Sequence, residues 1–178
     1  MKQDSGIRHM YAKGAGLTLL LTGIDQLTKY LAWTFLRPRL SVPLIPGVLE
    51  LYYLQNRGAA FGILQNQRWF FLILTAVFLA AIWLIWRRIP PARKYLPLRI
   101  LACAVTAGAA GNLIDRALLS YVRDFLYFSL IDFPIFNVAD IYVTVSAFAL
   151  FVLVLFVYKG EEDFAFLDRK KDGAGDGH

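Results

Sequence analysis

The amino-acid sequence predicts an all-α membrane protein, a bundle of four transmembrane helices with a small β-sheet outside the membrane. Of the 178 residues, 58% are apolar and only 18% are charged, whereas about a quarter of the residues in soluble domains are charged. The mean hydropathy is +0.51. The chain contains four apolar runs, and each is long enough to cross a hydrocarbon core, which needs about 20 helical residues.

The four runs predict helices over residues 15–36, 69–86, 98–118 and 138–158. The first run is interrupted by Asp25 and Lys29, and no small-residue cleavage site follows it. We therefore expect a retained helix and not a cleaved signal peptide. The second run contains no charge, the third carries charges only at its ends, and the fourth has one charge, Asp140, near its start.

The positive charges predict how the helices are oriented. Four crossings place both termini on one side of the membrane, together with the short loop between the second and third helices. That side carries 12 Lys and Arg residues and the other side carries six. By the positive-inside rule, residues 1–14 and the tail 159–178 are cytoplasmic and the membrane domain covers 15–158. The tail is expected to be largely disordered, beyond about Leu167. The net charge of +6 thus reflects orientation and indicates no nucleic-acid partner.

The two loops on the outer side, about 37–68 and 119–137, are the long ones, and long loops in compact proteins usually carry function. Residues 47–55 are rich in aliphatic and aromatic side chains and are bounded by Gly and Pro, which predicts a strand. Residues 123–128 show a similar pattern. The two segments are expected to pair into a small sheet that rests on the outer membrane surface.

Ionisable side chains within the apolar runs require a partner or a task, because each costs about 2.5–3.5 kcal/mol to insert. Asp25 and Lys29 stand four residues apart in the favourable acid-before-base order, so we interpret them as a structural ion pair. In the third helix Asn112, Asp115 and Arg116 share one face near the outer end. The glycines beside them favour close helix contact, so this stretch alone indicates a packing face.

Two carboxylates lie where the second outer loop joins the fourth helix. Asn137 and Asp140 fall in the first turn of that helix, and Asp124 lies 16 residues before Asp140. The loop can fold back and bring the carboxylates together, although two unrelated acids at a hydrated helix end remain an alternative. When two carboxylates are close, one keeps a proton while the other stays a base. Such a pair suits the hydrolysis of a peptide bond by water.

Other hydrolytic mechanisms lack the residues that they need. His9 and His178 lie at the predicted cytoplasmic ends, and no His-Glu-x-x-His spacing occurs. Cys103 is the only cysteine, which excludes a disulfide framework and a Cys-based zinc site. We therefore expect neither a metal nor a cofactor.

Five short segments, in this order along the chain, resemble the motifs of the lipoprotein signal peptidase family, also called signal peptidase II. They are Asp25-Gln-Leu-Thr-Lys29, Asn56-Arg-Gly-Ala-Ala-Phe61, Gly111-Asn-Leu-Ile-Asp-Arg116, Val122-Arg-Asp-Phe125 and Phe136-Asn-Val-Ala-Asp140. The resemblance covers about residues 15–158.

The resemblance implies a bacterial aspartic endopeptidase of the cytoplasmic (inner) membrane, with four transmembrane helices, an extracytoplasmic β-cradle and an active site at the extracytoplasmic face. It implies cleavage of prolipoproteins immediately before a Cys that carries diacylglycerol, and inhibition by globomycin. We expect a monomer surrounded by membrane lipid. By motif, the catalytic pair is Asp124 and Asp140. The residues that position the substrate or the pair are Asn56, Gly58, Asn112, Arg116 and Asn137, and the structural polar residues are Asp25, Lys29 and Asp115.

The chain departs from the family pattern at two positions. Ala107 replaces a frequent Gly in the third motif, and Arg123 replaces a commonly apolar residue. Arg123 would lower the pKa of Asp124 if its side chain turned inward, so the assignment of acid and base stays open.

Two other classes of function compete with the peptidase. A small transporter or proton-relay subunit would explain ionisable residues in apolar runs, but it predicts polar faces that continue to the cytoplasmic side. The second helix has no such face, and the inner halves of the third and fourth helices are apolar. A structural scaffold would require no acid at Asp124 or Asp140.

Overall fold

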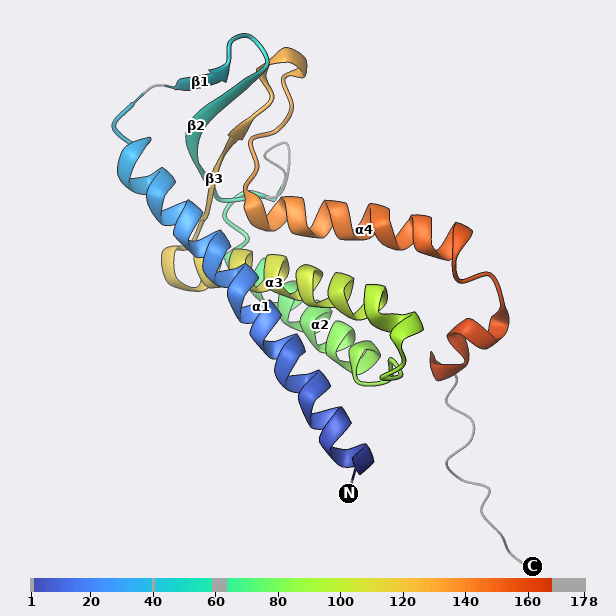
Figure 1. Cartoon of the computed structure of the whole chain (residues 1–178). Helices are drawn as coiled ribbons and strands as arrows, with labels where there is room; N and C mark the ends of the chain where they lie inside the picture. Colours follow the sequence, from blue (N-terminus) through green and yellow to red (C-terminus); the bar gives the residue numbers. More distant parts are fainter. Residues whose placement is uncertain (1, 40, 59–63, 168–178) are drawn as a thin grey trace, which may run out of the picture.

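The structure, a computed structural model, describes residues 2–39, 41–58 and 64–167. Its four long helices are α1 (Lys2–Phe35), α2 (Arg68–Trp86), α3 (Leu96–Leu119) and α4 (Val138–Phe156). A three-stranded sheet stands at one end of this bundle, and the N-terminus lies at the opposite end (Figure 1). The helical architecture and the small sheet agree with the predicted fold.

Three helical segments in the described ranges are long and apolar enough to cross a membrane: α2, α4, and α3 with the short 3-10 helix η2 (Arg93–Tyr95) before it. In α2 only Phe71 and Trp86 are buried, and most of its other side chains are exposed. An apolar helix exposed in this way is typical of contact with lipid. The protein is therefore a membrane protein. Helix α1 does not reach the same apolarity, so a fourth crossing remains a prediction.

Helix α1 begins at Lys2, well before the predicted start at residue 15. Its additional turns contain Met10 and Tyr11, which pack against a buried cluster around Trp86 and Tyr158. The rings of Tyr11 and Trp86 lie 4.9 Å apart. Tertiary packing thus extends the helix beyond the apolar run that predicted it.

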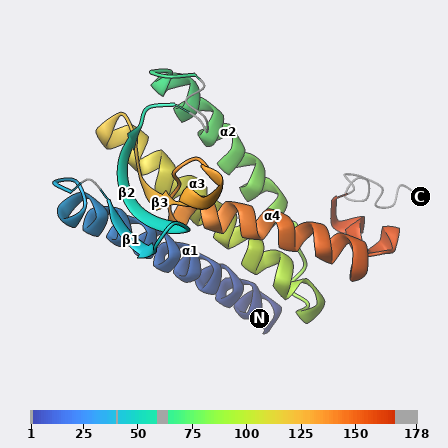
Figure 2. The ribbon, with the colours of Figure 1, turned by 90° about the horizontal axis from the view of Figure 1, so that it is seen from above.

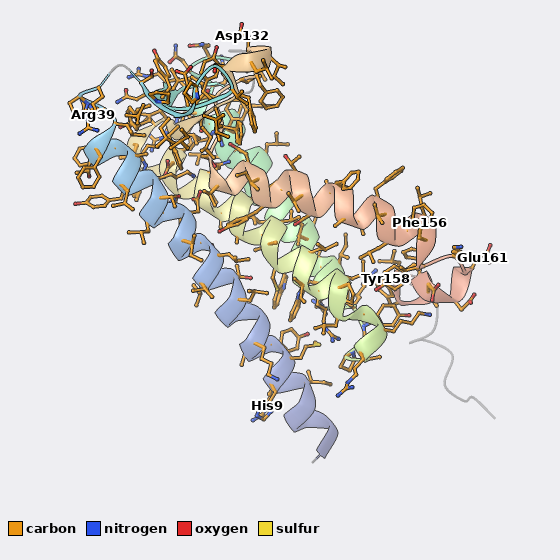
Figure 3. The ribbon with its side chains drawn as sticks, turned by 45° about the horizontal axis from the view of Figure 1, so that its top comes forward. His9, Arg39, Asp132, Phe156, Tyr158 and Glu161 are labelled. Atoms are coloured by element: carbon orange, nitrogen blue, oxygen red, sulfur yellow. The ribbon has the colours of Figure 1, made fainter. Side chains whose placement is uncertain are left out.

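The other helices agree with their predicted ranges within about two residues at each end. The first part of the tail, before the disorder predicted beyond about Leu167, is ordered. Glu161–Leu167 form a 3-10 helix, η4, which begins close to Tyr158 (Figure 3). Asp163 forms an ion pair with Lys94, and the hydroxyl of Tyr158 donates to the Lys94 carbonyl at 2.7 Å. These contacts order the chain as far as Leu167, and the predicted disorder beyond it lies outside the described residues.

The sheet is antiparallel, in the order β1 (Val42–Ile45), β2 (Leu49–Asn56) and β3 (Val122–Tyr127). The predicted pairing between the two outer loops is confirmed: Leu54 of β2 lies opposite Asp124 of β3. Strand β1 was not predicted. It contains Pro43, which cannot donate to a ladder and is tolerated at a sheet edge. Gly47, with φ of +71°, turns the chain from β1 into β2.

Helix α3 lies between the other three helices and contacts each of them (Figure 2). Two glycines make this close packing possible. A Cβ at Gly108 would overlap the Ala139 carbonyl of α4, and a Cβ at Gly111 would overlap the Asp25 carboxylate of α1. The packing face predicted for the third helix is confirmed, since small residues allow helices to approach closely in lipid.

Gly111→Ala is therefore expected to lower the melting temperature of the purified protein by about 3–10 °C, because overpacking a core costs about 1–3 kcal/mol. Gly23→Ala is the matched control on α1, since nothing lies within 4 Å of the Cβ that it adds. Thermal unfolding in detergent measures both variants. Equal melting temperatures for the two would contradict the close contact.

Candidate active site

The predicted site residues converge at the sheet end of the bundle. A cavity of about 490 Å³ lies between the sheet, the outer end of α3 and the first turns of α4. Its polar lining is Asn56, Gly58, Asn112, Arg116, Asp124 and Asp140. Its apolar lining is Val122, Phe128, Phe133, Pro134, Ile135, Phe136, Ile141 and Val145, with Thr144 beside them. The cavity thus combines one polar wall with one apolar wall.

Asp124 is held at the centre of the polar wall by strand β3. Its side chain is only 2% exposed. Asn56 of β2 donates from Nδ2 to Oδ2 of Asp124 at 2.9 Å, and Asn137 donates from Nδ2 to Oδ1 at 2.6 Å. Each carboxylate oxygen therefore has an amide donor, which fixes the orientation of the group.

Asp140 is positioned by the start of α4, through a reciprocal capping arrangement. Oδ1 of Asn137 accepts from the backbone N–H of Asp140 at 3.2 Å, and Oδ2 of Asp140 accepts from that of Asn137 at 3.1 Å. Oδ1 of Asp140 also accepts from Nδ2 of Asn112 at 2.8 Å. A carboxylate in the first turn of a helix is stabilised by the helix dipole.

Asn137 is fully buried and links the two carboxylates. Its Nδ2 donates to Asp124 and, at 3.2 Å, to Oδ1 of Asn112, and its oxygen caps α4 at Asp140. One side chain therefore sets the relative position of a strand carboxylate and a helix carboxylate.

The ion pair predicted within α1 is confirmed, since Lys29 Nζ lies 2.9 Å from Asp25 Oδ2 and both side chains are fully buried. Lys29 also donates to Oδ1 of Asn112 at 2.8 Å. Because that oxygen is an acceptor, the amide nitrogen of Asn112 must face Asp140. Asp25 Oδ1 accepts from the backbone N–H of Ala139 at 3.0 Å, so α1 also holds the first turn of α4.

Arg123 turns away from Asp124. Its Nη2 lies 2.6 Å from Asp115 Oδ1, its Nε donates to Asp115 Oδ2 at 3.0 Å, and Nη2 also donates to Gln26 Oε1 at 2.8 Å. Neighbouring residues of a strand point to opposite faces, so an inward Asp124 sends Arg123 outward to α1 and α3. The condition under which Arg123 would lower the pKa of Asp124 is therefore not met, and Arg123 is instead paired with Asp115.

Gln26 was not among the predicted site residues. Its Nε2 contacts the Gly111 carbonyl at 3.1 Å and Asp115 Oδ1 at 3.2 Å, while its Oε1 accepts from Arg123. The available signal was its position as a polar residue beside Asp25 in an apolar run. Gln26 joins α1, α3 and β3 directly behind the candidate site.

Arg116 is the only Lys or Arg among the described residues that line the cavity. Its Nη2 donates to the Gly58 carbonyl at 3.3 Å, and its guanidinium lies 4.7 Å from the ring centroid of Phe71. The cation–π contact anchors the guanidinium against α2. Gly58 is held in turn by its N–H, which donates to Asn56 Oδ1 at 2.9 Å. Residues 59–63, which include the end of the Asn56–Phe61 motif, lie outside the described residues.

The electrostatic environment favours a proton on Asp124. Burial, and after it the negative charge of Asp140, raise the pKa of Asp124 from 3.8 to about 7. The amide donors Asn56 and Asn137 lower it by less. At neutral pH the site can therefore offer a protonated carboxyl at Asp124. In the described part of the chain, no three His, Cys, Asp or Glu side chains come together as a metal site would require.

A second cavity, of about 420 Å³, adjoins the first between α2, α3 and α4. It shares Asn112, Arg116, Asp140 and Thr144 with the first cavity and adds Leu74, Thr75, Phe78, Ala109 and Val143. Asp140 therefore borders both cavities, the one under the sheet and the one between the helices.

The fold and the site define a class of protein: a helical membrane protein with a cavity at one end of the bundle that is lined by carboxylates. The sequence profile of signal peptidase II matches residues 17–156. The lipoprotein signal peptidase of Brevibacillus brevis is 43% identical over 157 residues, which cover 88% of this chain and 96% of that protein. That of Streptococcus thermophilus is 42% identical over 143 residues, which cover 80% and 90%.

A bacterial membrane enzyme solved by the in meso method at 2.3 Å resolution superposes with a TM-score of 0.72 and 30% identity. The superposition covers 84% of this chain and 93% of that one. The chain belongs to the signal peptidase II family, as its five motifs predicted, and it is therefore a peptidase.

Proposed function

We propose that the protein is an aspartic endopeptidase that removes signal peptides from bacterial prolipoproteins whose lipobox Cys carries diacylglycerol. Cleavage falls immediately before that Cys. The observation that carries the proposal is the placement of Asp124 and Asp140 in one cavity, joined through Asn137 and each held by amide donors. The names of the relatives support the substrate class.

In the proposed mechanism the two aspartates activate water without a covalent intermediate. Asp124, whose pKa is near 7, holds the proton, and Asp140 is the base. The water oxygen attacks the scissile carbonyl carbon and gives its proton to Asp140, while Asp124 gives its proton to the carbonyl oxygen. When the tetrahedral intermediate collapses, the C–N bond breaks, Asp140 returns a proton to the leaving amine, and Asp124 regains its own.

The cavity offers groups that hold the substrate in the geometry that this reaction needs. Arg116, anchored between Phe71 and the Gly58 carbonyl, presents N–H donors for a peptide carbonyl. Asn56 and Asn112 keep the carboxylates in place and leave the centre of the cavity for the substrate. The apolar wall suits the side chains of a lipobox and the start of the acyl chains, and the adjoining cavity suits a signal peptide that approaches between the helices.

The proposal includes four membrane crossings with both termini in the cytoplasm. Helix α1 supplies the fourth crossing, because Asp25 and Lys29 neutralise each other inside the bundle while Leu19 and Leu27 are exposed on its outer surface. The excess of basic residues at the end away from the sheet favours this orientation. The sheet and the candidate site then lie at the outer face of the cytoplasmic membrane. Globomycin is expected to inhibit the protein, which acts as a monomer without a cofactor.

The direct test is cleavage of a diacylglyceryl-modified lipobox peptide by the purified protein in detergent, with the product identified by mass spectrometry. We expect a new N-terminus at the modified Cys, and no product when globomycin is present. A product cut elsewhere would overturn the proposed specificity. No cleavage of this peptide by folded protein would overturn the proposed substrate class.

The pH dependence tests the assignment of Asp124 as the acid. Because its pKa is raised to about 7, Asp124 is protonated below that pH and loses its proton above it. We expect kcat/KM to fall about tenfold per pH unit above pH 7, since kcat/KM reports the pKa values of the free enzyme. Asn56→Ala removes a donor that lowers this pKa, so its descending limb is expected at higher pH, whatever its overall rate. A limb that moves to lower pH would contradict the assignment.

A further inference from the structure

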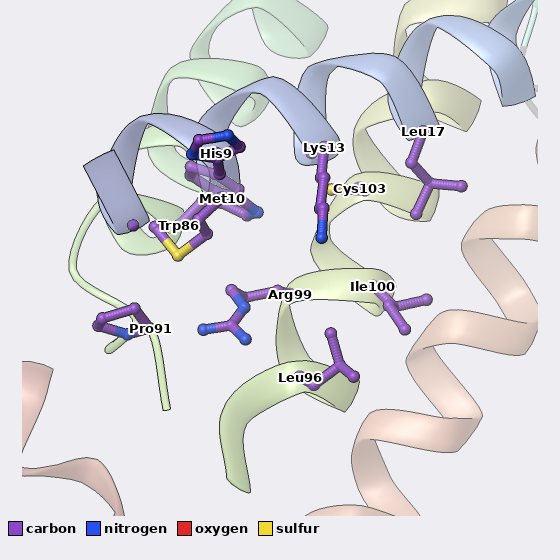
Figure 4. A pocket seen from close by; sticks show the side chains of 12 residues that line it. His9, Met10, Lys13, Leu17, Trp86, Pro91, Leu96, Arg99, Ile100 and Cys103 are labelled. Atoms are coloured by element: carbon purple, nitrogen blue, oxygen red, sulfur yellow. The ribbon is translucent and has the colours of Figure 1, made fainter. Parts of the chain in front are cut away.

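A third cavity, of about 310 Å³, lies at the end of the bundle opposite the sheet, between α1, the α2–α3 loop and α3. Figure 4 shows Lys13 on α1 and Arg99 on α3 extending toward the same space. Leu17 and the buried Cys103 lie along the side of the cavity that leads into the bundle. The cavity therefore has a polar mouth and an apolar interior.

The mouth carries positive charge that no ion pair among the described residues neutralises. The 12 described residues that line the cavity include Lys13 and Arg99 and no acidic residue. None of the ion pairs in the described part of the chain involves Lys13 or Arg99. Arg99 donates from Nη1 to the Pro90 carbonyl at 2.5 Å, which holds the guanidinium at the cavity. In the same loop Lys94 is neutralised by Asp163, so the charge at this cavity is not a general property of the loop.

A buried donor also lines the cavity. Trp86 is 7% exposed, and its indole nitrogen has no hydrogen-bond partner among the described atoms. A buried indole N–H usually has an acceptor. Gly14, which also lines the cavity, lies against the six-membered ring of this indole, with Cζ2 and Cη2 nearest to it. Two cations and an unpaired N–H donor together form a site for an oxyanion.

We propose that this cavity binds the phosphate headgroup of an anionic membrane lipid. Lys13 and Arg99 contact the phosphate, and Trp86 donates to one of its oxygens. A lipid fits better than a soluble phosphate because Leu96 and Ile100, which border the mouth, are 48% and 45% exposed on the outer surface of α3, where acyl chains can lie. Basic pockets between helices at the membrane surface are typical sites for lipid headgroups.

Native mass spectrometry of the full-length protein in detergent tests the proposal, with phosphatidylglycerol as the anionic probe and phosphatidylcholine as the neutral one. The double variant Lys13→Gln/Arg99→Gln is expected to bind phosphatidylglycerol about tenfold more weakly. Arg87→Gln/Arg93→Gln is the matched control, because it removes the same charge from the same end of the protein but neither residue lines the cavity. Its binding is expected to stay within about twofold of the unmodified protein. Equal losses in the two double variants, or no loss in either, would overturn the proposal.

Two further arms identify the group that is bound. Replacing Trp86 with benzothienylalanine keeps the size and shape of the bicyclic ring and exchanges only the indole N–H for sulfur, and it is expected to weaken phosphatidylglycerol binding several-fold with little change in melting temperature. If the double variant fails to fold, lipid binding by this variant still tests the proposal. Millimolar inorganic phosphate is expected to leave the bound lipid in place. Complete displacement by inorganic phosphate would show that the site selects a soluble anion and would overturn the lipid assignment.

Discussion

Replacing Asp124 or Asp140 with Asn is expected to reduce cleavage of the lipidated peptide by more than about 10³-fold, because Asn serves neither as base nor as acid. The substitution keeps the shape of the side chain. It also leaves part of the hydrogen bonding, since the Asn oxygen can still accept from Asn137 at either position. The main loss is therefore expected in turnover, with the fold kept.

Both variants cost the structure hydrogen bonding. At position 124 the new amide nitrogen faces Nδ2 of Asn56, which cannot flip because its oxygen accepts from the Gly58 N–H. At position 140 the new amide nitrogen faces Nδ2 of Asn112, which cannot flip because its oxygen accepts from Lys29. We therefore expect a larger fall in melting temperature for Asp140→Asn than for a surface change, with secondary structure kept. Circular dichroism and thermal unfolding in detergent measure this difference alongside turnover.

Asp132→Asn is the matched control for both variants. Asp132 lies between β3 and α4 and is exposed at the tip of the sheet region (Figure 3). Among the described residues its side chain hydrogen-bonds only with the Tyr127 hydroxyl, at 2.6 Å. The activity of the Asp132→Asn variant is expected to stay close to that of the unmodified protein. If Asp124→Asn or Asp140→Asn kept a turnover within tenfold of the unmodified protein, the proposed catalytic pair would be refuted.

The second large effect concerns the lipid on the substrate. A lipobox peptide with an unmodified Cys is expected to be cleaved with a kcat/KM lower by orders of magnitude than the same peptide with diacylglycerol. Asp140 opens α4 and Asp124 lies in the adjoining strand, so the pair sits where an apolar helix ends. Two acyl chains contribute about 0.8 kcal/mol per buried CH₂ and anchor the modified Cys at that depth. Remote binding energy of this kind positions the reacting bond.

A third peptide separates positioning from recruitment to the detergent micelle. It carries diacylglycerol on a Cys placed four residues further from the scissile bond, so its affinity for the micelle is the same but its peptide bond is displaced. We expect it to be cleaved as poorly as the unmodified peptide. If the unmodified and the correctly lipidated peptides were cleaved at equal rates below saturation, the depth argument and the substrate class would both fail.

Much of the helical framework and several site residues could be predicted from the sequence, because they depend on residues close along the chain. Uninterrupted apolar runs defined α2, α3 and α4 within about two residues at each end. The i,i+4 spacing placed Asp25 beside Lys29. The ordered motifs selected the residues that line the cavity, although their proposed roles in catalysis remain predictions.

The contacts that support the site were decided by the tertiary structure. Asp25 accepts from Ala139, 114 residues away, and Gln26 meets Arg123, 97 residues away. Such partners depend on how closely α1 and α4 approach α3, which no local pattern encodes. Arg123 shows the difference clearly, because its position beside Asp124 in the sequence suggested an electrostatic effect on that carboxyl, whereas the strand directs it to Asp115 on the other face.

The sequence by itself determined that this chain forms long apolar helices with polar groups gathered toward one end, because hydropathy and helical spacing are local properties. It also determined the family, through five short motifs in order. Only the tertiary structure decided that α1 extends to Lys2, that β1 joins the sheet, and that Asn137 connects Asp124 to Asp140. Each of these depends on contacts between distant segments, and their stability comes from burial and hydrogen bonds that exist only after the helices have packed.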